Sequence, residues 1–239
     1  MKHVALVLAR SKSQSIVNKN LLMINHEPLI SYSLRVLAKC EFFSEFWVST
    51  DSKEIATIAE KIAPKVGVHF RSKQMSSSVT SSLDSTKDFL ATREDIDVLY
   101  LVQCTSPVQR KSLFRKACQM MEEEESKWDS IFSVTRSHNL RWTHDSDGHL
   151  VPLNFDSSCR PRRQDWQGEL IETGHFYAAR RTLIMAQNLL QSGQRCAFVE
   201  FPSSICMELD EPWQIPFIEL MVAKYYTDDD EREDCIEKS

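Results

Sequence analysis

Charged side chains flank a serine-rich loop near the start of the chain. The apolar run Val4–Ala9 leads into "RSKSQSIVNKN", which begins at Arg10 and contains Lys19. A loop that follows a buried strand is where α/β proteins hold phosphate. Arginine binds phosphate through paired hydrogen bonds and lysine as a point charge. Because the first glycine of the chain is Gly67, this predicted phosphate loop must work without the glycines that such loops usually contain.

Two later stretches also carry side chains suited to ligand chemistry. "RPRRQDW" gathers three arginines, a glutamine and a tryptophan between Arg160 and Trp166. This cluster offers a cation fork and neutral hydrogen-bonding groups, and its rival interpretations are a nuclear localisation signal or a solvated basic patch. "SICMELDEPW" contains Glu208 and Asp210, whose carboxylates are hard oxygen ligands for a divalent cation.

The elements that must position these residues alternate between strands and helices. Buried strands are expected in four apolar runs: Val4–Ala9, Phe46–Ser49, Val98–Val102 and Ser130–Val134. Helices are expected between and after them, where apolar residues recur at helical spacing: Leu29–Ala38, Ile55–Ile62, Leu83–Thr92 and Leu113–Glu124. This alternation predicts an α/β fold of βαβ units with a mostly parallel sheet. The loops after Ala9, Ser49 and Val102 should then share the edge where such sheets bind ligands.

The alternation breaks over residues 137–174, a polar segment rich in tryptophan and arginine. It contains a plausible hairpin with Asp147 and Gly148 at its turn, and we interpret it as an excursion from the sheet toward a partner subunit. A strand from Phe176, a helix over Arg180–Leu190 and a strand over Ala197–Phe201 are expected to follow. A last helix should run to about Tyr226 and begin near Pro216.

Length and composition indicate one domain, expected over 1–226, followed by an acidic tail over 227–239. The net charge of −5 argues against bulk binding of nucleic acid. No apolar stretch approaches the roughly 20 residues of a membrane span, and the N-terminus does not resemble a signal peptide. Seven scattered cysteines without a CxxC pair predict reduced thiols, a cytoplasmic or nuclear location and no structural zinc.

Five stretches, taken in order, resemble the CMP-sialic acid synthetases (N-acylneuraminate cytidylyltransferases) of the animal type. They are "LVLARSKSQSIVNKN", "WVSTDSKEI", "RSKQMSSSVTSSLD", "LVQCTSP" and "RPRRQDWQGELIETGHFY". The resemblance implies a Rossmann-like three-layer fold with a small protruding dimerisation subdomain, assembled as a homodimer or a dimer of dimers. It also implies transfer of CMP from CTP to the anomeric hydroxyl of a sialic acid such as Neu5Ac, with release of pyrophosphate.

The resemblance assigns roles to the residues that match the family motifs. Catalytic roles fall to Arg10, Lys19, Glu208 and Asp210, and the last two would hold a divalent metal, Mg²⁺ before others. The expected nucleotide pocket consists of Arg10, Ser13, Lys19, Asn20, Arg71 and Ser82. The expected sugar pocket consists of Gln103, Arg162, Arg163, Gln164 and Tyr177. Asn20 carries the donor and acceptor that cytosine or ribose recognition needs. Without the motif, Arg71 could equally form a surface ion pair and Ser82 a helix cap.

Two motifs depart from the family pattern. The family loop reads close to "ARGGSKGIPLKN", whereas here all three glycines are replaced and the inner lysine is Gln14. We therefore expect weaker CTP binding than in a glycine-rich relative, unless the backbone avoids left-handed geometry and side chains replace the lost contacts. Cys206 stands where the family carries the first aspartate of an Asp-x-Asp pair. Either Glu208 and Asp210 hold Mg²⁺ with less help, or Mn²⁺ or a softer cation becomes acceptable. The simplest interpretation of Cys206 is a small buried apolar residue.

Two rival functions stay open. Within the same class, the substrate could be another 2-keto sugar acid; "RPRRQDW" argues against KDO, whereas KDN could share the site. From another class, the chain could be a catalytically silent relative that binds nucleotide or a partner protein and regulates it, because the loop and the metal motif have both changed.

Overall fold

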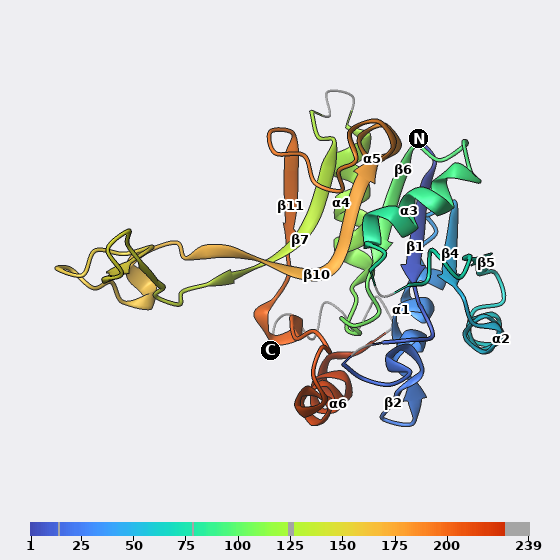
Figure 1. The fold of residues 1–239 in the computed structure, drawn as a ribbon, viewed down its shortest axis with the longest axis horizontal. Helices are drawn as coiled ribbons and strands as arrows, with labels where there is room; N and C mark the ends of the chain where they lie inside the picture. Colours follow the sequence, from blue (N-terminus) through green and yellow to red (C-terminus); the bar gives the residue numbers. More distant parts are fainter. Residues whose placement is uncertain (14, 78, 124–126, 228–239) are drawn as a thin grey trace.

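The computed structural model describes residues 1–227 except 14, 78 and 124–126, and the predicted acidic tail beyond Thr227 lies outside the described residues. Seven strands form the central sheet in the order β11-β7-β10-β6-β1-β4-β5. Their bounds are β1 His3–Leu8, β4 Glu45–Thr50, β5 Gly67–Phe70, β6 Val98–Val102, β7 Ser130–Ser137, β10 Glu169–Arg180 and β11 Cys196–Glu200. β10 is antiparallel to both of its neighbours, and the other pairs are parallel. The predicted mostly parallel sheet is confirmed (Figure 1).

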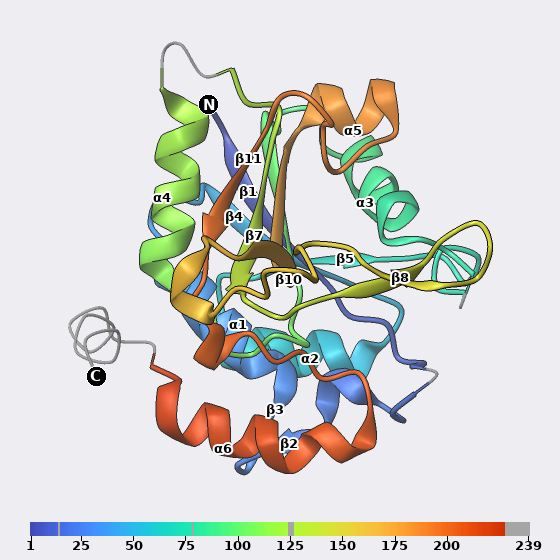
Figure 2. The same ribbon diagram turned by 90° about the vertical axis from the view of Figure 1, so that its left-hand side faces the viewer.

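Helices cover both faces of this sheet, as Figure 2 shows. The helices are α1 Leu29–Ala38, α2 Lys53–Ile62, α3 Ser82–Ala91, α4 Lys111–Glu122, α5 Arg181–Gln187 and α6 Ile215–Tyr225. Alternate residues of β1 point to opposite faces, so Ala5 and Val7 join a core with α1, α2, α4 and α6, whereas Val4 and Leu6 join a smaller core with α3 and α5. The predicted three-layer arrangement follows from this division of the core.

Local signals in the sequence account for several helix ends. Ser52 caps α2 by accepting a hydrogen bond from the Ile55 amide, and Ser81 and Asp84 form a reciprocal capping box at the start of α3. Pro216 lies in the first turn of α6, as expected for a proline at a helix start. The short strand β5 was not predicted, because its residues Gly67–Phe70 include a glycine and a histidine and form no continuous apolar run.

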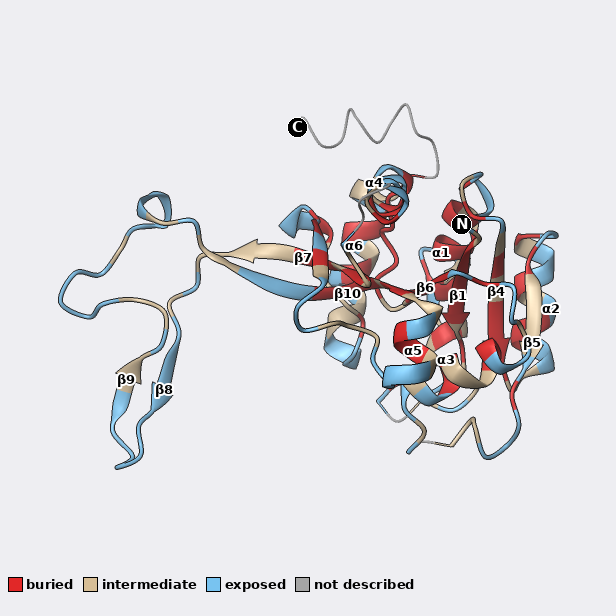
Figure 3. Cartoon of the chain, turned by 90° about the horizontal axis from the view of Figure 1, so that it is seen from above, coloured by how far each residue is buried: buried red, intermediate tan, exposed pale blue. Residues whose placement is uncertain are grey.

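An arm projects from the sheet where β7 and β10 continue past their neighbours (Figures 1 and 3). Glu169 pairs with Ser137 and Glu172 with Val134, and a bulge then separates Glu172 from Tyr177. The two strands thus stay paired inside the predicted 137–174 excursion, and the segment that leaves the sheet is residues 138–168. β10 also starts at Glu169, well before the expected Phe176.

The arm contains the predicted hairpin. β8 (Trp142–His144) pairs with β9 (Leu150–Pro152), and Gly148 occupies the turn with a φ of 84° that favours glycine. The Asp145 carboxylate accepts hydrogen bonds from the amides of Asp147 and His149, which fixes this turn.

The remaining elements are short: η1 Lys19–Leu21, β2 Met23–Ile24, β3 Glu27–Pro28, η2 Arg163–Asp165, η3 Ser203–Ile205 and η4 Pro212–Gln214. None of the helices in the described part of the chain is both long and apolar enough to span a membrane.

Candidate active site

A cavity of about 400 Å³ opens at the carboxyl edge of the sheet. Loops after β1, β5 and β6 contribute to its wall, together with the start of α3 and the segment after η3. The lining residues are Leu8, Arg10, Ser13, Lys19, Asn20, Arg71, Thr80, Ser81, Ser82, Ser85, Gln103, Thr105, Glu208 and Asp210. Three cations and two carboxylates therefore face one space. Every residue predicted for the nucleotide or the metal lines this cavity, as does Gln103 from the predicted sugar pocket.

The glycine-free loop after β1 reaches the cavity without strain at its serines. In the described part of residues 10–20, Asn18 alone has a positive φ, of 52°, and asparagine tolerates this conformation better than most residues. Arg10 follows β1, and its Nη1 donates a hydrogen bond to the Ser77 carbonyl at 3.2 Å. The described serines of the loop therefore avoid left-handed geometry, Asn18 does not, and Gln14 lies outside the described residues.

Arg71 is the most deeply buried cation of the cavity, with 8% of its surface exposed. It follows β5, and its Nη1 donates to Ser85 Oγ on α3 at 3.2 Å. Its Nε and Nη2 are also buried and contact no acceptor among the described residues. Burial lowers the pKa of Arg71 although Asp51 opposes this effect. Buried donors without acceptors are costly, so they point to an anionic or hydrogen-bonding ligand.

Ser82 lies at the start of α3, beside the Ser81 cap. The hydroxyl of Ser81 is engaged with Asp84 in the capping box, so the helix start offers the cavity the Ser82 hydroxyl and its dipole, which attracts anions.

Lys19 is held on the opposite wall by the segment after η3. Its Nζ donates to the Leu209 carbonyl at 2.8 Å and forms an ion pair with Asp210 at 3.2 Å. Residues far apart in the sequence are thereby joined, and one cation is paired with one of the two predicted metal-binding carboxylates.

Glu208 is enclosed more tightly than Asp210. Thr105 Oγ1 donates to Glu208 Oε1 at 2.7 Å, and the Thr105 carbonyl accepts the Leu209 amide at 2.8 Å. A Cβ at Gly174, which has a φ of 63°, would lie 2.7 Å from Glu208 Oε2. Burial raises the pKa of Glu208, and the hydrogen bond from Thr105 and the charge of Lys19 oppose this shift. Thr105 and Gly174 lie in two of the quoted motifs but received no role there, and the structure shows that they confine this carboxylate.

Tyr177 adjoins the cavity through Gln103. The Tyr177 hydroxyl donates to the Glu172 carboxylate, and Gln191 Nε2 donates to the other Glu172 oxygen at 2.9 Å. Burial, followed by these interactions with Glu172, raises the pKa of Tyr177, and a hydrogen bond from Gln103 opposes the shift. The two predicted sugar-binding residues of the sheet are thus neighbours.

Asn20 has a different set of contacts from those predicted. Its Nδ2 donates to the Arg10 carbonyl at 2.9 Å, and its Oδ1 accepts from the Cys104 thiol at 3.0 Å. Its amide therefore ties the end of the loop to its start and to the segment that follows β6. Burial raises the pKa of Cys104 to about 12, which keeps this thiol protonated and able to donate.

Cys206 does not line the cavity. Its Sγ donates to the Pro202 carbonyl at 3.1 Å, and the side chain packs against the larger core. Burial raises its pKa to about 11. A protonated thiol turned toward backbone and core agrees with the interpretation of Cys206 as a packing residue.

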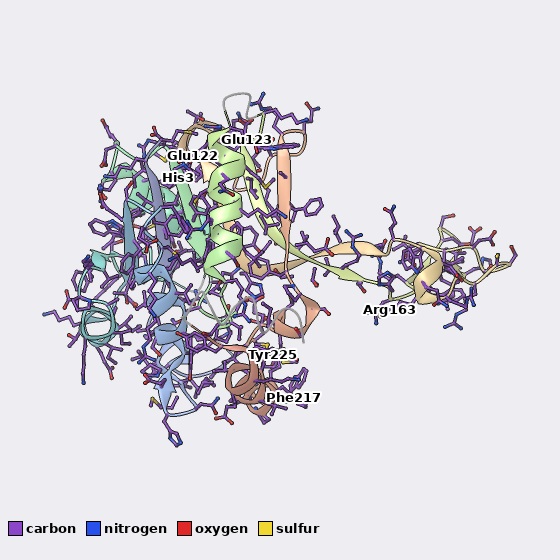
Figure 4. All side chains as sticks on the ribbon, turned by 180° about the vertical axis from the view of Figure 1, so that it is seen from behind. His3, Glu122, Glu123, Arg163, Phe217 and Tyr225 are labelled. Carbon is purple, nitrogen blue, oxygen red and sulfur yellow. The ribbon has the colours of Figure 1, made fainter. Side chains whose placement is uncertain are left out.

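The arginine-rich motif lies on the arm, away from the cavity of its own chain. Figure 4 shows Arg163 far out from the sheet. Arg162 is exposed and pairs with Asp165 at 3.0 Å, and Gln164 is also exposed. Within one chain, the structure therefore does not bring Arg162, Arg163 and Gln164 to Gln103 and Tyr177. The reason is that the paired strands β7 and β10 carry the motif outward.

The carboxylates Glu208 and Asp210 suit a hard divalent cation. Mg²⁺ sites usually use one or two carboxylates and complete the coordination with water and substrate phosphates. The described residues contain no group of three or more His, Cys, Asp and Glu side chains that could bind a metal alone. The donor set thus fits a cation that arrives with a phosphate ligand better than one held by protein alone.

The layers of the sheet and the charged cavity at its carboxyl edge define a Rossmann-like α/β protein of the nucleotide-binding class. Two solved structures share this fold. CMP-2-keto-3-deoxy-manno-octonic acid synthetase complexed with CTP aligns with a TM-score of 0.67 at 17% identity, over 93% of this chain and 99% of that one. 4-Diphosphocytidyl-2C-methyl-D-erythritol synthase from Anaerococcus prevotii aligns with a TM-score of 0.66 at 13% identity, over 93% and 96%.

Sequence comparison gives the family. The protein-family model described as "Cytidylyltransferase" matches residues 4–225, so this chain belongs to the cytidylyltransferase family. It is 38% identical over 219 residues to N-acylneuraminate cytidylyltransferase A of Danio rerio and 37% identical over 221 residues to the N-acylneuraminate cytidylyltransferase of Oncorhynchus mykiss. Each match covers 90% of this chain, which spans about half the length of these relatives, 50% and 49% respectively. The resemblance inferred from the five motifs is confirmed.

Proposed function

We propose that this chain is an N-acylneuraminate cytidylyltransferase, which transfers CMP from CTP to a sialic acid. In this reaction the anomeric oxygen of the sugar bonds to the α-phosphorus of CTP. The bond from that phosphorus to the bridging oxygen breaks, pyrophosphate leaves and the hydroxyl proton is released. The observation that carries the proposal is the gathering of three cations and two carboxylates in one cavity. The names of the animal relatives support the choice of sugar.

The chain's own residues would act mainly by position and charge, because phosphoryl transfer demands little covalent chemistry of the protein. Arg10 and Lys19 would neutralise charge on the triphosphate, and Lys19 would do so from a place fixed by Leu209 and Asp210. Arg71 would supply its unpartnered Nε and Nη2 to the nucleotide. Ser13 and Ser82 would add hydroxyl contacts along the same wall.

Glu208 and Asp210 would hold Mg²⁺, which when bound would offset negative charge on the phosphates. Mn²⁺ or a softer cation is the alternative where Mg²⁺ affinity is low. Thr105 would keep Glu208 facing the cavity. The sugar would contact Gln103 and Tyr177, at the end of the cavity nearest β10.

We further propose a homodimer in which each arm reaches the cavity of the other chain. The arm exposes apolar side chains that it cannot bury alone, including Trp142 at 49%, Leu150 at 59% and Leu153 at 52%. Its exposed Arg162, Arg163 and Gln164 would then complete the partner's sugar pocket. The same exposed basic stretch is consistent with a nuclear location, with the cytoplasm as the alternative.

Pyrophosphate release from CTP and Neu5Ac with Mg²⁺ tests the activity. Glu208→Gln should abolish release, whereas Glu60→Gln, which makes the same change at an exposed position on α2, should not. A wild-type chain that releases no pyrophosphate with Mg²⁺, Mn²⁺ or Zn²⁺ would favour the catalytically silent alternative. Replacing Neu5Ac by KDN measures the substrate range.

Sedimentation tests the dimer. Leu150→Asp on the arm should dissociate it, and Leu189→Asp, which adds the same charge at an exposed leucine after α5, should not. A wild-type chain that sediments as a monomer at micromolar concentration would contradict the assembly.

A further inference from the structure

One carboxylate holds the glycine-free loop immediately after Arg10. Asp51 Oδ1 accepts the Ser11 amide at 2.7 Å, and Asp51 Oδ2 accepts the Ser11 hydroxyl at 2.8 Å. Asp51 directly follows β4, the neighbour of β1 in the sheet, and the Ala9 amide donates to the Ser49 carbonyl at 2.9 Å. The pairing of the two strands is thus extended into the loop by a side chain.

The ionised form of Asp51 is the one that can accept both bonds. Partial burial works against ionisation, but the backbone and side-chain hydrogen bonds from Ser11 and the positive charge of Arg71 outweigh it, so the pKa of Asp51 is lowered. Hydrogen bonds to an ionised acceptor are stronger than those between neutral groups. The carboxylate therefore holds Ser11 more firmly than a neutral acceptor would.

The peptide group between Arg10 and Ser11 is held at both its amide and its carbonyl. Ser11 is held by Asp51, and the Arg10 carbonyl accepts a hydrogen bond from Asn20 Nδ2. The guanidinium is then directed by the Ser77 carbonyl. The direction in which Arg10 enters the cavity thus depends on these anchors.

We propose that Ser11 and Asp51 are positioning residues, which fix the glycine-free loop so that Arg10 meets the triphosphate. A glycine in place of Ser11 would offer Asp51 its amide alone. The serine adds a second, charge-assisted bond to the same carboxylate without entering the left-handed region, where Asn18 is the one described loop residue. Where a glycine would give the loop a conformationally free backbone, Ser11 gives it a hydrogen bond from its hydroxyl to Asp51. This inference rests on the proposed function, because it takes CTP as the ligand.

Ser11→Ala should weaken CTP binding about tenfold, because the loop must be reordered at the expense of binding energy. Saturating CTP restores the loop, so KM for CTP should rise about tenfold while kcat changes less than twofold. Ser11→Thr keeps the hydroxyl and should restore affinity. The matched control is Ser15→Ala, which removes an exposed hydroxyl from the same loop and should leave affinity unchanged. Asp51→Asn should weaken binding, and combining it with Ser11→Ala should add less than the sum of the two changes.

Amide hydrogen exchange of the nucleotide-free full chain gives a readout that does not need CTP. Exchange of the Ser11 amide should be slow in the wild type and in Ser15→Ala, and at least tenfold faster in Asp51→Ala, which leaves the amide no side-chain acceptor. Equal CTP affinity in Ser11→Ala and Ser15→Ala, or strictly additive effects of Ser11→Ala and Asp51→Asn, would overturn the inference. If the wild type binds no CTP, the proposed function fails, and fast exchange of the wild-type Ser11 amide would then overturn the positioning pair as well.

Discussion

Arg71→Met is expected to stabilise the nucleotide-free protein and to abolish its stabilisation by CTP. Arg71 is 8% exposed as a residue, and the Nε and Nη2 atoms of its guanidinium are buried but contact no acceptor among the described residues. The one hydrogen bond in its favour is the 3.2 Å contact with Ser85. A methionine fills similar space with no donors, so it removes the unsatisfied groups and keeps most of the packing.

The size of the effect follows from these contacts. Each buried donor left without an acceptor costs about 1–3 kcal/mol, so the two nitrogens together cost about 2–6 kcal/mol. The substitution also removes the hydrogen bond to Ser85, which reduces the gain in stability by about 1 kcal/mol. It removes the attraction of the partly buried Asp51, which reduces the gain by about another 1 kcal/mol. The expected gain is about 2 kcal/mol, which corresponds to a rise in Tm of about 4–8 °C for a chain of this size.

Thermal and urea unfolding with and without CTP measure both halves of the prediction. At a CTP concentration of about 100 times Kd, the wild type should gain about 2.7 kcal/mol, and Arg71→Met should gain nothing measurable. Arg115→Met, at an exposed position on α4, should change neither stability nor the CTP effect by more than about 1 kcal/mol. If Arg71→Met unfolds at a lower temperature than the wild type without CTP, or keeps the CTP effect, the reasoning about its unpartnered nitrogens is wrong.

Two further substitutions and one pH series test other parts of the site. Gly174→Ala should displace Glu208, destabilise the fold by about 1–3 kcal/mol and abolish pyrophosphate release, because the new Cβ would lie 2.7 Å from Glu208 Oε2 and the φ of 63° disfavours alanine. Gly148→Ala is the control. Its Cβ meets no atom within 4 Å, so this change should cost about 1 kcal/mol and leave release intact. Thr105→Val should reduce release at least tenfold and Thr105→Ser should retain it, and equal activity of the two variants would remove the Thr105 hydroxyl from the site. Burial lowers the pKa of His175 to about 3, whereas the pKa in the unfolded chain is 6.5. The neutral ring therefore contributes its full stabilisation at pH values above 6.5, and this contribution is lost as the pH falls toward 3. The free energy of unfolding, measured with urea, should therefore fall by about 1.4 kcal/mol per pH unit below pH 6.5, in addition to any fall seen in His175→Gln. Equal slopes of this free energy against pH in the two proteins would contradict the prediction.

The sequence predicted those parts of the fold whose patterns are local. Helix α1 has the predicted bounds, and β6 does as well, because periodic apolar residues and flanking breaks define them. The length of β10 could not be predicted. Its first third, Glu169 to Glu172, lies in the segment interpreted as an excursion from the sheet, and its strand geometry comes from pairing with β7 outside the core.

The cavity was predictable where residues follow strands, and less so elsewhere. Arg10 and Gln103 each directly follow a predicted strand, so topology alone brings them to one edge. Thr105 and Gly174 act by touching Glu208, and no spacing in the sequence reports a contact across the fold. The same reason explains Asn20, whose contact with the Cys104 thiol joins residues 84 positions apart.

The altered metal motif becomes intelligible once Glu208 is seen with its neighbours. Cys206 does not line the cavity, whereas Glu208 and Asp210 do, and Glu208 has the longer side chain of the two. A longer carboxylate needs room and a fixed direction. The missing Cβ of Gly174 supplies the room, and the Thr105 hydroxyl supplies the direction. Lys19 donates a hydrogen bond to the Leu209 carbonyl, between the two carboxylates, so it holds the backbone that carries them as well as lining the cavity. A cysteine at position 206 therefore does not by itself argue for a silent protein, because Glu208, the carboxylate proposed to bind the metal, is oriented by Thr105 and has room beside Gly174.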